Sequence, residues 1–192
     1  MPNKDIVKAF DVSLILYAEH SFNVSTFTAR TITSSLSDIH GAITGAIASL
    51  KGPLHGGANE EVMHMMNKIK KPEKAHKWIN KALDNKDVIM GFGHRVYKSG
   101  DSRVPTMREY FGKVAKIKKD KKFEKIYDIV EKVMIDRKNI HPNVDYPTGP
   151  TYHLMGFDTD FFTPIFVISR ITGWSAHIMD CLLYTSDAAD EE

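Results

Sequence analysis

Apolar residues recur every three or four positions along most of this chain, and this spacing constrains the fold more than any other feature of the sequence. The spacing places apolar side chains on one face of a helix, whereas the alternation typical of half-buried strands is scarce. The clearest stretches are formed by Ile6, Val7, Phe10, Leu14 and Tyr17, by Ile39, Ile43, Ile47 and Leu50, and by Phe123, Ile126, Tyr127, Val130, Val133 and Met134. Glycine, proline and asparagine separate such stretches, as in turns between helices. The sequence therefore predicts an all-α fold.

Helix packing and helix ends can be predicted from particular residues. The second stretch is mixed with glycine and alanine, which implies that this helix packs closely against a neighbour. Pro72 suits the first turn of a short helix around Trp78 that ends in the polar run 84–87. The third stretch predicts a helix that ends near the turn at 139–142.

Composition excludes several classes of protein. The chain has 192 residues, of which 42% are hydrophobic, enough for an ordinary domain with a core. The net charge of +2 argues against a nucleic-acid partner, and the lysine-rich run 116–125 is interpreted as a solvated helix face. No apolar stretch approaches the roughly 20 residues that span a bilayer, so no membrane partner is expected and the cytoplasm is the predicted location. A single cysteine, Cys181, excludes an internal disulfide framework and a cysteine-based zinc site.

Three short stretches each combine one ionisable side chain with residues that permit unusual backbone geometry. They are Gly52-Pro-Leu-His-Gly-Gly-Ala-Asn-Glu60, Gly91-Phe-Gly-His-Arg95 and Asn143-Val-Asp145. Glycine tolerates positive φ and close approach, so His55 and His94 can be aimed by rigid loops. Two histidines and a carboxylate suit proton transfer at carbon, since imidazole can donate or accept and an ionised aspartate is a natural base. We interpret the three stretches as one active site.

These stretches, in this order, resemble those of the citrate synthase family. The resemblance runs from about Phe10 to Met179. It includes the segment Leu16-Tyr-Ala-Glu-His-Ser-Phe-Asn-Val-Ser-Thr26, the run 51–66, the segment 91–98 and Thr163-Pro-Ile-Phe-Val-Ile-Ser-Arg-Ile-Thr-Gly-Trp174. It implies a citrate synthase-like all-α fold and an acyltransferase that condenses acetyl-CoA with oxaloacetate and water to give citrate and CoA. No permanently bound cofactor or metal is implied, because the acyl-CoA is a co-substrate.

The resemblance also implies roles for the catalytic residues. Asp145 would remove the proton from the acyl group, and His55 would donate to the thioester oxygen, where enolate charge develops. The dipole of a helix that begins after Gly56 and Gly57 would favour a neutral His55. His94 would polarise the keto carbonyl under attack.

Substrate contacts are implied in the same way. Arginine suits the two carboxylates of the keto acid, and the expected contacts are Arg103, Arg170, His20 and Phe166. The expected contacts with CoA are Val88, Ile89, Arg95, Lys98 and Asn143.

The resemblance predicts how the chain is organised. Residues 56–164 would form the family's small domain, and 1–55 and 165–180 would belong to its large domain. Residues 181–192 resemble a translated sequencing adapter, and we expect a non-native tail there. The resemblance begins in what would be the middle of a family member, so a fragment is expected that is inactive alone and whose full-length form is a homodimer.

Three alternatives stay open at this point. A 2-methylcitrate synthase would use propionyl-CoA, and one methyl group is worth only about 1 to 3 kcal/mol in a pocket, too little to read from sequence. Two histidines and one aspartate could instead form the metal site of a metal-dependent hydrolase or oxygenase. The chain could also be an inactive CoA-binding fragment.

Overall fold

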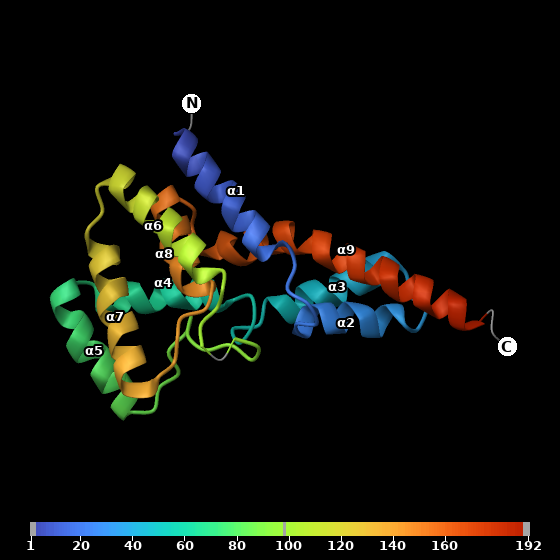
Figure 1. Cartoon of the computed structure of the whole chain (residues 1–192), viewed down its shortest axis with the longest axis horizontal. Helices are drawn as coiled ribbons and strands as arrows, with labels where there is room; N and C mark the ends of the chain where they lie inside the picture. Colours follow the sequence, from blue (N-terminus) through green and yellow to red (C-terminus); the bar gives the residue numbers. More distant parts are fainter. Residues whose placement is uncertain (1–2, 98, 190–192) are drawn as a thin grey trace. The chain divides into compact units, whose positions relative to one another are not determined.

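The computed structural model describes residues 3–97 and 99–189, with side chains as far as Tyr184. Within this part the chain forms α-helices, one 3-10 helix and no strand, apart from an isolated bridge between Phe92 and Pro142 (Figure 1). The predicted all-α class is confirmed. The helices are α1 (Lys4–Ala18), α2 (Val24–Thr33), α3 (Ile39–Leu50), α4 (Ala58–Ile69), α5 (Pro72–Asp84), α6 (Val104–Lys118), α7 (Lys122–Lys138), α8 (Asp145–Met155), η1 (Thr159–Phe161) and α9 (Phe162–Ala189).

Local sequence explains where several helices begin and end. The side chain of Asn23 accepts a hydrogen bond from Thr26 N at the start of α2, and Asp38 caps α3 through Gly41 N. Pro72 occupies the first turn of α5, where its missing N–H costs nothing. Asn139 ends α7 in the left-handed region, with φ +52°. The predicted start and end of α5 and the predicted end of α7 are confirmed.

The buried face of α3 differs from the predicted apolar stripe. Ile39 and Ile47 are 43% and 38% exposed, whereas the small residues Ala42 and Ala46 are fully buried. Close packing against α2 is the reason, since a Cβ on Gly45 would lie 2.2 Å from the Ile32 side chain of α2. The prediction of close helix packing is confirmed, but its face is set by the small residues and not by the isoleucines.

The chain divides into two compact units. The first contains the residues up to Ser13 together with Ala58–Phe162, and the second contains Leu14–Gly57 and the chain from Thr163 onward. The predicted division placed all of 1–55 in one piece, but the beginning of α1 belongs with the first unit. Phe10 packs on the rings of Tyr152 and Phe157, and Ser13 Oγ lies 2.9 Å from Tyr152 OH. These contacts with α8 explain the difference.

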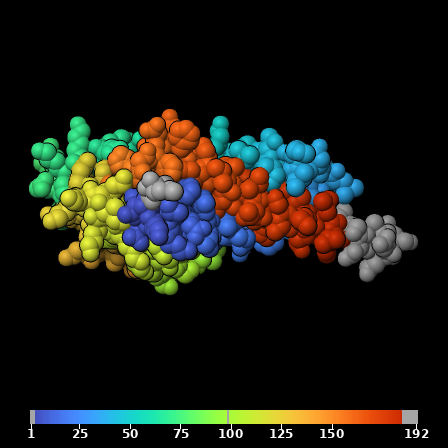
Figure 2. Space-filling view, turned by 90° about the horizontal axis from the view of Figure 1, so that it is seen from above, coloured from blue at the N-terminus to red at the C-terminus, as the bar shows by residue number. Residues whose placement is uncertain are grey.

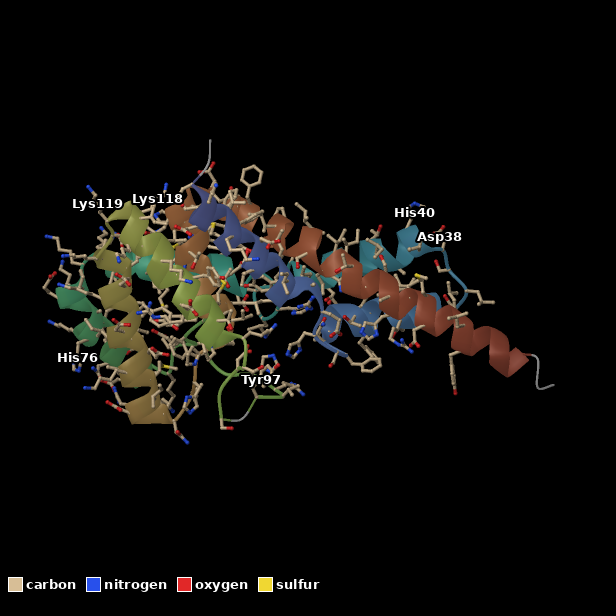
Figure 3. The ribbon with its side chains drawn as sticks, turned by 45° about the horizontal axis from the view of Figure 1, so that its top comes forward. Asp38, His40, His76, Tyr97, Lys118 and Lys119 are labelled. Carbon is tan, nitrogen blue, oxygen red and sulfur yellow. The ribbon has the colours of Figure 1, made fainter. Side chains whose placement is uncertain are left out.

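Each unit has its own core. In the first, Met63, Met65 and Met66 are buried on α4 and fill the core with Ile79 of α5 and Phe111 of α6. Lysines 118 and 119 at the end of α6 point away from this core and are exposed (Figure 3).

In the second unit, Tyr17, Leu50 and Trp174 are fully buried. The surface of α9 runs beside that of α2 and α3 (Figure 2), where Arg30 of α2 donates to the carbonyl of His177.

The backbone of α9 is helical to Ala189, while the side chains of 185–192 lie outside the described part, and so does most of the predicted non-native tail. Among the described residues, no helix combines the length and the apolar character needed to cross a membrane.

Candidate active site

The predicted site residues divide between the two units. His20, His55, Phe166 and Arg170 belong to the second unit. The first unit contains Val88, Ile89, His94, Arg95, Arg103, Asn143 and Asp145. We describe each group by itself, and the convergence of His55, His94 and Asp145 on one substrate stays a prediction.

A hydrogen-bonded turn between α3 and α4 presents His55. His55 N and Gly57 N both donate to the carbonyl of Gly52, at 2.9 and 3.2 Å. A Cβ on Gly56 would lie 2.5 Å from the Leu50 side chain and 2.7 Å from the Leu50 carbonyl. Gly56 is therefore required for close approach of the turn to the end of α3, as the sequence predicted.

The surroundings of His55 keep its ring neutral and fix its tautomer. Burial, and secondarily the positive charge of Arg170, lower the pKa of His55 to about 4. Burial is thus the main cause, whereas the sequence analysis had invoked a helix dipole. Ser25 N donates to His55 Nε2 at 3.3 Å, and since a backbone N–H can only donate, the proton of the neutral ring lies on Nδ1. His55 can therefore serve as a neutral donor through Nδ1.

Ser25 is a residue that the sequence analysis missed. Its Oγ accepts from Trp174 Nε1 at 3.1 Å and lies 2.8 Å from His55 Nε2 and 2.7 Å from Asn23 Oδ1, two acceptors that share its one hydroxyl proton. Ser25 thus connects the imidazole to the buried core of its unit. The only signal in the sequence was its place in the segment 16–26 that carries the family resemblance.

We expect the His55 ring to stay neutral at pH 5, with its proton on Nδ1. A folded pKa near 4 against about 6.5 in the unfolded chain means that the unfolded state gains the proton first as pH falls. His55 therefore destabilises the folded chain progressively between about pH 6.5 and 4, by about 3 kcal/mol at the lower end.

Nitrogen chemical shifts of the histidine rings test this expectation, with His55→Gln assigning the signal. Titration of His55 near pH 6.5 would contradict it.

Arg170 is fixed beside two aromatic rings in the second unit. It is only 2% exposed, and its Nε donates to the carbonyl of Tyr17 at 2.6 Å. Its guanidinium carbon lies 4.8 Å from the centre of the Phe166 ring, and that ring lies 6.4 Å from the ring of His55. The structure therefore brings Arg170, Phe166 and His55 together, and a buried, oriented guanidinium of this kind suits a carboxylate.

In the first unit, two glycines shape the loop that carries His94. Gly91 and Gly93 have φ of +83° and +78°, so side chains there would be strained. Gly93 N donates to the carbonyl of His141, and Asn143 N donates to that of Gly91. The His94 loop is thereby tied to the segment that precedes α8.

His94 has the opposite tautomer to His55. Its Nδ1 accepts from Val96 N at 3.0 Å and from Tyr97 N at 3.3 Å, so the proton of the neutral ring lies on Nε2. Burial and the charge of Arg103 lower the pKa of His94, and Asp101 offsets part of this effect. His94 can therefore act as a neutral donor through Nε2.

Asp145 is the first residue of α8, where the helix dipole stabilises a negative charge. Its N–H donates to Asn143 Oδ1 at 3.1 Å, and Asn143 Nδ2 donates to the carbonyl of Gly93 at 3.0 Å. The Asn143 side chain thus joins the start of α8 to the His94 loop. Its predicted contact with CoA stays a prediction.

Asp101 is the second residue that the sequence analysis missed, although it lies two positions before the predicted keto-acid contact Arg103. Its side chain is fully buried and accepts from Arg103 Nε at 3.0 Å and Nη2 at 2.7 Å. It also accepts from the N–H of Val144 at 3.0 Å. Burial alone would raise the pKa of Asp101, but the hydrogen bonds and the charge of Arg103 outweigh it and hold the pKa below the ordinary value.

A pocket of about 200 Å³ in the first unit adjoins His94. It is lined by residues of the His94 loop, including Tyr97 (labelled in Figure 3) and Asp101, and by the segment 139–142. Of the predicted CoA contacts, Val88 is 76% exposed and Arg95 is exposed, whereas Ile89 is buried. Lys98 lies outside the described residues.

The alternative of a metal site requires a group of ligands. Among the described residues, no three histidine, cysteine, aspartate or glutamate side chains are grouped so that they could hold a metal ion.

Comparison with known proteins gives concordant matches. Residues 1–186 match the family model of the citrate synthase C-terminal domain. The chain is 61% identical to 2-methylcitrate synthase 2 of Corynebacterium glutamicum, over 91% of this chain and 45% of that protein. It is 54% identical to a citrate synthase of Mycolicibacterium smegmatis, over 94% of this chain and 48% of that protein. The chain thus spans about half the length of the relatives it matches.

The fold has matches among solved structures. A ternary complex of citrate synthase from Thermoplasma acidophilum with carboxymethyl coenzyme A and oxaloacetate matches with a TM-score of 0.87 and 38% identity. This match covers 94% of this chain and 49% of the other. The citrate synthase of Thermotoga maritima matches with a TM-score of 0.86 and 36% identity, over 94% of this chain and 50% of the other.

Proposed function

Since this chain belongs to the citrate synthase family, we propose that it carries the catalytic groups of an enzyme that condenses acetyl-CoA with oxaloacetate. One observation supports the proposal most strongly: in both His55 and His94 a backbone N–H donates to one ring nitrogen, which places the proton of the neutral ring on the other nitrogen, and burial lowers the pKa of both rings. The reaction needs two neutral donors, one for each carbonyl oxygen that gains charge. A metal ligand set or a surface role would not require two complementary tautomers.

The first step creates a carbon nucleophile. The carboxylate of Asp145 removes a proton from the methyl group of the thioester, while Nδ1–H of His55 donates to the thioester oxygen. Because the pKa of His55 is near 4, the ring stays neutral at pH 7, and a neutral donor suits an enol-like intermediate.

In the second step, this carbon attacks the keto carbon of oxaloacetate. His94 donates through Nε2 to the keto oxygen, which becomes the hydroxyl group of the product. Water then hydrolyses the thioester, releasing CoA and the tricarboxylate.

The keto acid has two carboxylates, which we assign to Arg103 and Arg170. Asp101 engages two of the five N–H donors of Arg103 and so orients the guanidinium. Tyr17 and Phe166 orient Arg170 in the same way. His20 is the further contact with the keto acid, and the contacts with CoA are assigned to Val88, Ile89, Arg95, Lys98 and Asn143.

A second candidate is the homologous reaction with propionyl-CoA, which gives 2-methylcitrate. The relative with 61% identity is named a 2-methylcitrate synthase, and this name supports the candidate. The two acyl groups differ by one methyl, and a pocket discriminates it by about 1 to 3 kcal/mol.

A chimera tests the function. Residues 1–186 of this chain replace the matching segment of the Corynebacterium glutamicum relative, so that all residues assigned above come from this chain. Release of the CoA thiol is followed with oxaloacetate and either acetyl-CoA or propionyl-CoA. Turnover of acetyl-CoA supports the first candidate, and a kcat/KM at least about tenfold higher for propionyl-CoA supports the second. A folded chimera without thiol release from either would refute the proposal.

Arg170→Lys should weaken the binding of oxaloacetate by about 10- to 100-fold, because lysine keeps the charge but cannot form the bidentate pair. The measurement is the KM for oxaloacetate in the chimera, with Lys113→Arg as a control on the exposed face of α6. An unchanged KM would remove Arg170 from the keto-acid site.

We further propose a cytoplasmic location and a homodimeric full-length protein. Size-exclusion chromatography with light scattering on the chimera tests the oligomeric state, and a monomer with full turnover would refute it.

A further inference from the structure

The segment 17–23 consists of the last two residues of α1 and the connection to α2, and it carries His20. Ser21 has φ +46°, a left-handed conformation that a serine adopts only when its neighbours hold it there. Asn23 contributes by donating through Nδ2 to the carbonyl of His20 at 3.2 Å. The position of His20 thus depends on how firmly this short segment is held.

His177 of α9 contacts the segment on both sides of His20. Its Nε2 lies 3.1 Å from Glu19 Oε1, and because a carboxylate can only accept, the ring nitrogen donates. The imidazole also packs against the Phe22 ring, with 5.3 Å between the ring centres. The guanidinium carbon of Arg30 also lies over the Phe22 ring, 5.1 Å from its centre, and Arg30 donates to the His177 carbonyl at 3.1 Å. One imidazole therefore holds the residues that flank the turn at His20.

Arg170 and His177 act on the same segment from one face of α9. They are seven residues apart, which is two helical turns. Arg170 holds the Tyr17 carbonyl and His177 holds Glu19. Between them, a Cβ on Gly173 would lie 2.4 Å from the Ala18 carbonyl oxygen and 3.2 Å from the Cα of Glu19. Gly173 thus lets the segment lie directly on α9.

We propose that His177 is a positioning residue that clamps the His20 segment onto α9 and so sets the affinity for the keto acid. The assignment of His20 to the keto acid rests on the proposed function, whereas the clamp itself does not. Glu19 is 52% exposed and His177 19% exposed, so the pair adds little to global stability. Its effect is expected in the local order of 17–23 and in substrate binding.

Hydrogen–deuterium exchange on the chain itself tests the clamp without any activity. His177→Ala should speed amide exchange in 17–25 by about tenfold and leave α4 to α8 unchanged. His177→Gln, which keeps an N–H donor, should restore most of the protection. His40→Ala is the matched control, since it removes an exposed imidazole of the same unit that does not contact the segment (Figure 3).

Equal exchange of 17–25 in the wild type and in His177→Ala would overturn the clamp. If His177→Ala does not fold, the same exchange measurement is made on Glu19→Ala, which removes the contact between Glu19 and His177 from the other side.

Steady-state kinetics in the chimera tests the link to the substrate. His177→Ala should raise the KM for oxaloacetate by about tenfold, while kcat changes by less than about twofold. His177→Gln should have a KM close to that of the unsubstituted chimera. A faster exchange with an unchanged KM would overturn the role in substrate affinity. An inactive wild-type chimera would instead refute the proposed function and leave the exchange result standing.

Discussion

Replacing Asp145 by asparagine is expected to lower kcat by about 10²- to 10⁴-fold, because the amide cannot take the proton from the acyl group. The substitution keeps the shape of the side chain, and the contact of residue 145 with Asn143 uses the backbone N–H, which is unchanged. The KM for oxaloacetate should therefore change little. The measurement is thiol release by the chimera with saturating acyl-CoA.

The control for this prediction is Asp136→Asn on the exposed face of α7. It removes the same charge from the first unit without touching the His94 loop or α8. A kcat for Asp145→Asn within threefold of the control would show that another group is the base.

Asp101→Asn is expected to destabilise the first unit by about 3 kcal/mol, because it leaves the guanidinium of Arg103 without its buried counter-charge. The value is at the lower end of the range for buried pairs, since Arg103 retains 13% exposure. The hydrogen bond from Val144 N would also weaken, so α8 would lose an anchor beside Asp145. Urea unfolding of the chain at pH 7 measures the change.

Asp128→Asn is the matched control, because Asp128 pairs with Arg108 at 2.9 Å but is 60% exposed. An exposed pair of this kind contributes about 0.2 to 1 kcal/mol. Equal effects of the two substitutions would contradict the structural role of Asp101.

The lowered pKa of Asp101 also makes the free energy of unfolding depend on pH. The ionised carboxylate contributes its full stabilisation above about pH 4, and this stabilisation is lost as the pH falls through the folded-state pKa, which lies below 3.8.

Periodicity and turn residues were sufficient to predict the class of the fold and several helix ends. Pro72 and Asn139 act through their own backbone geometry, which does not depend on the rest of the molecule. Gly56 and Gly91 could be read in the same way, as positions where the chain needs close approach or positive φ. Local effects of this kind are written in the sequence because they involve only a few neighbouring residues.

The candidate site could be predicted only in part. His55 and His94 stood out because of the residues beside them, but the tautomer of each ring depends on backbone groups that the fold places there. For His55 that group is Ser25, which lies 30 residues away. The prediction of a neutral His55 agrees with its lowered pKa, but its main cause is burial, which the sequence does not display.

The sequence by itself determined the helical class of the fold, several helix ends and the residue types that can carry the chemistry, because each follows from local conformation or from a contiguous motif. Only the tertiary structure decided which face of α3 is buried, how Asp101 joins Arg103 to the start of α8, and that His177 holds the segment of His20. The last two features join residues that are far apart in the sequence. Asp101 and Val144 are 43 positions apart, and Glu19 and His177 are 158 positions apart. Close packing sets such contacts, because a side chain's partners depend on which helices lie against it and on how near the small residues let them come.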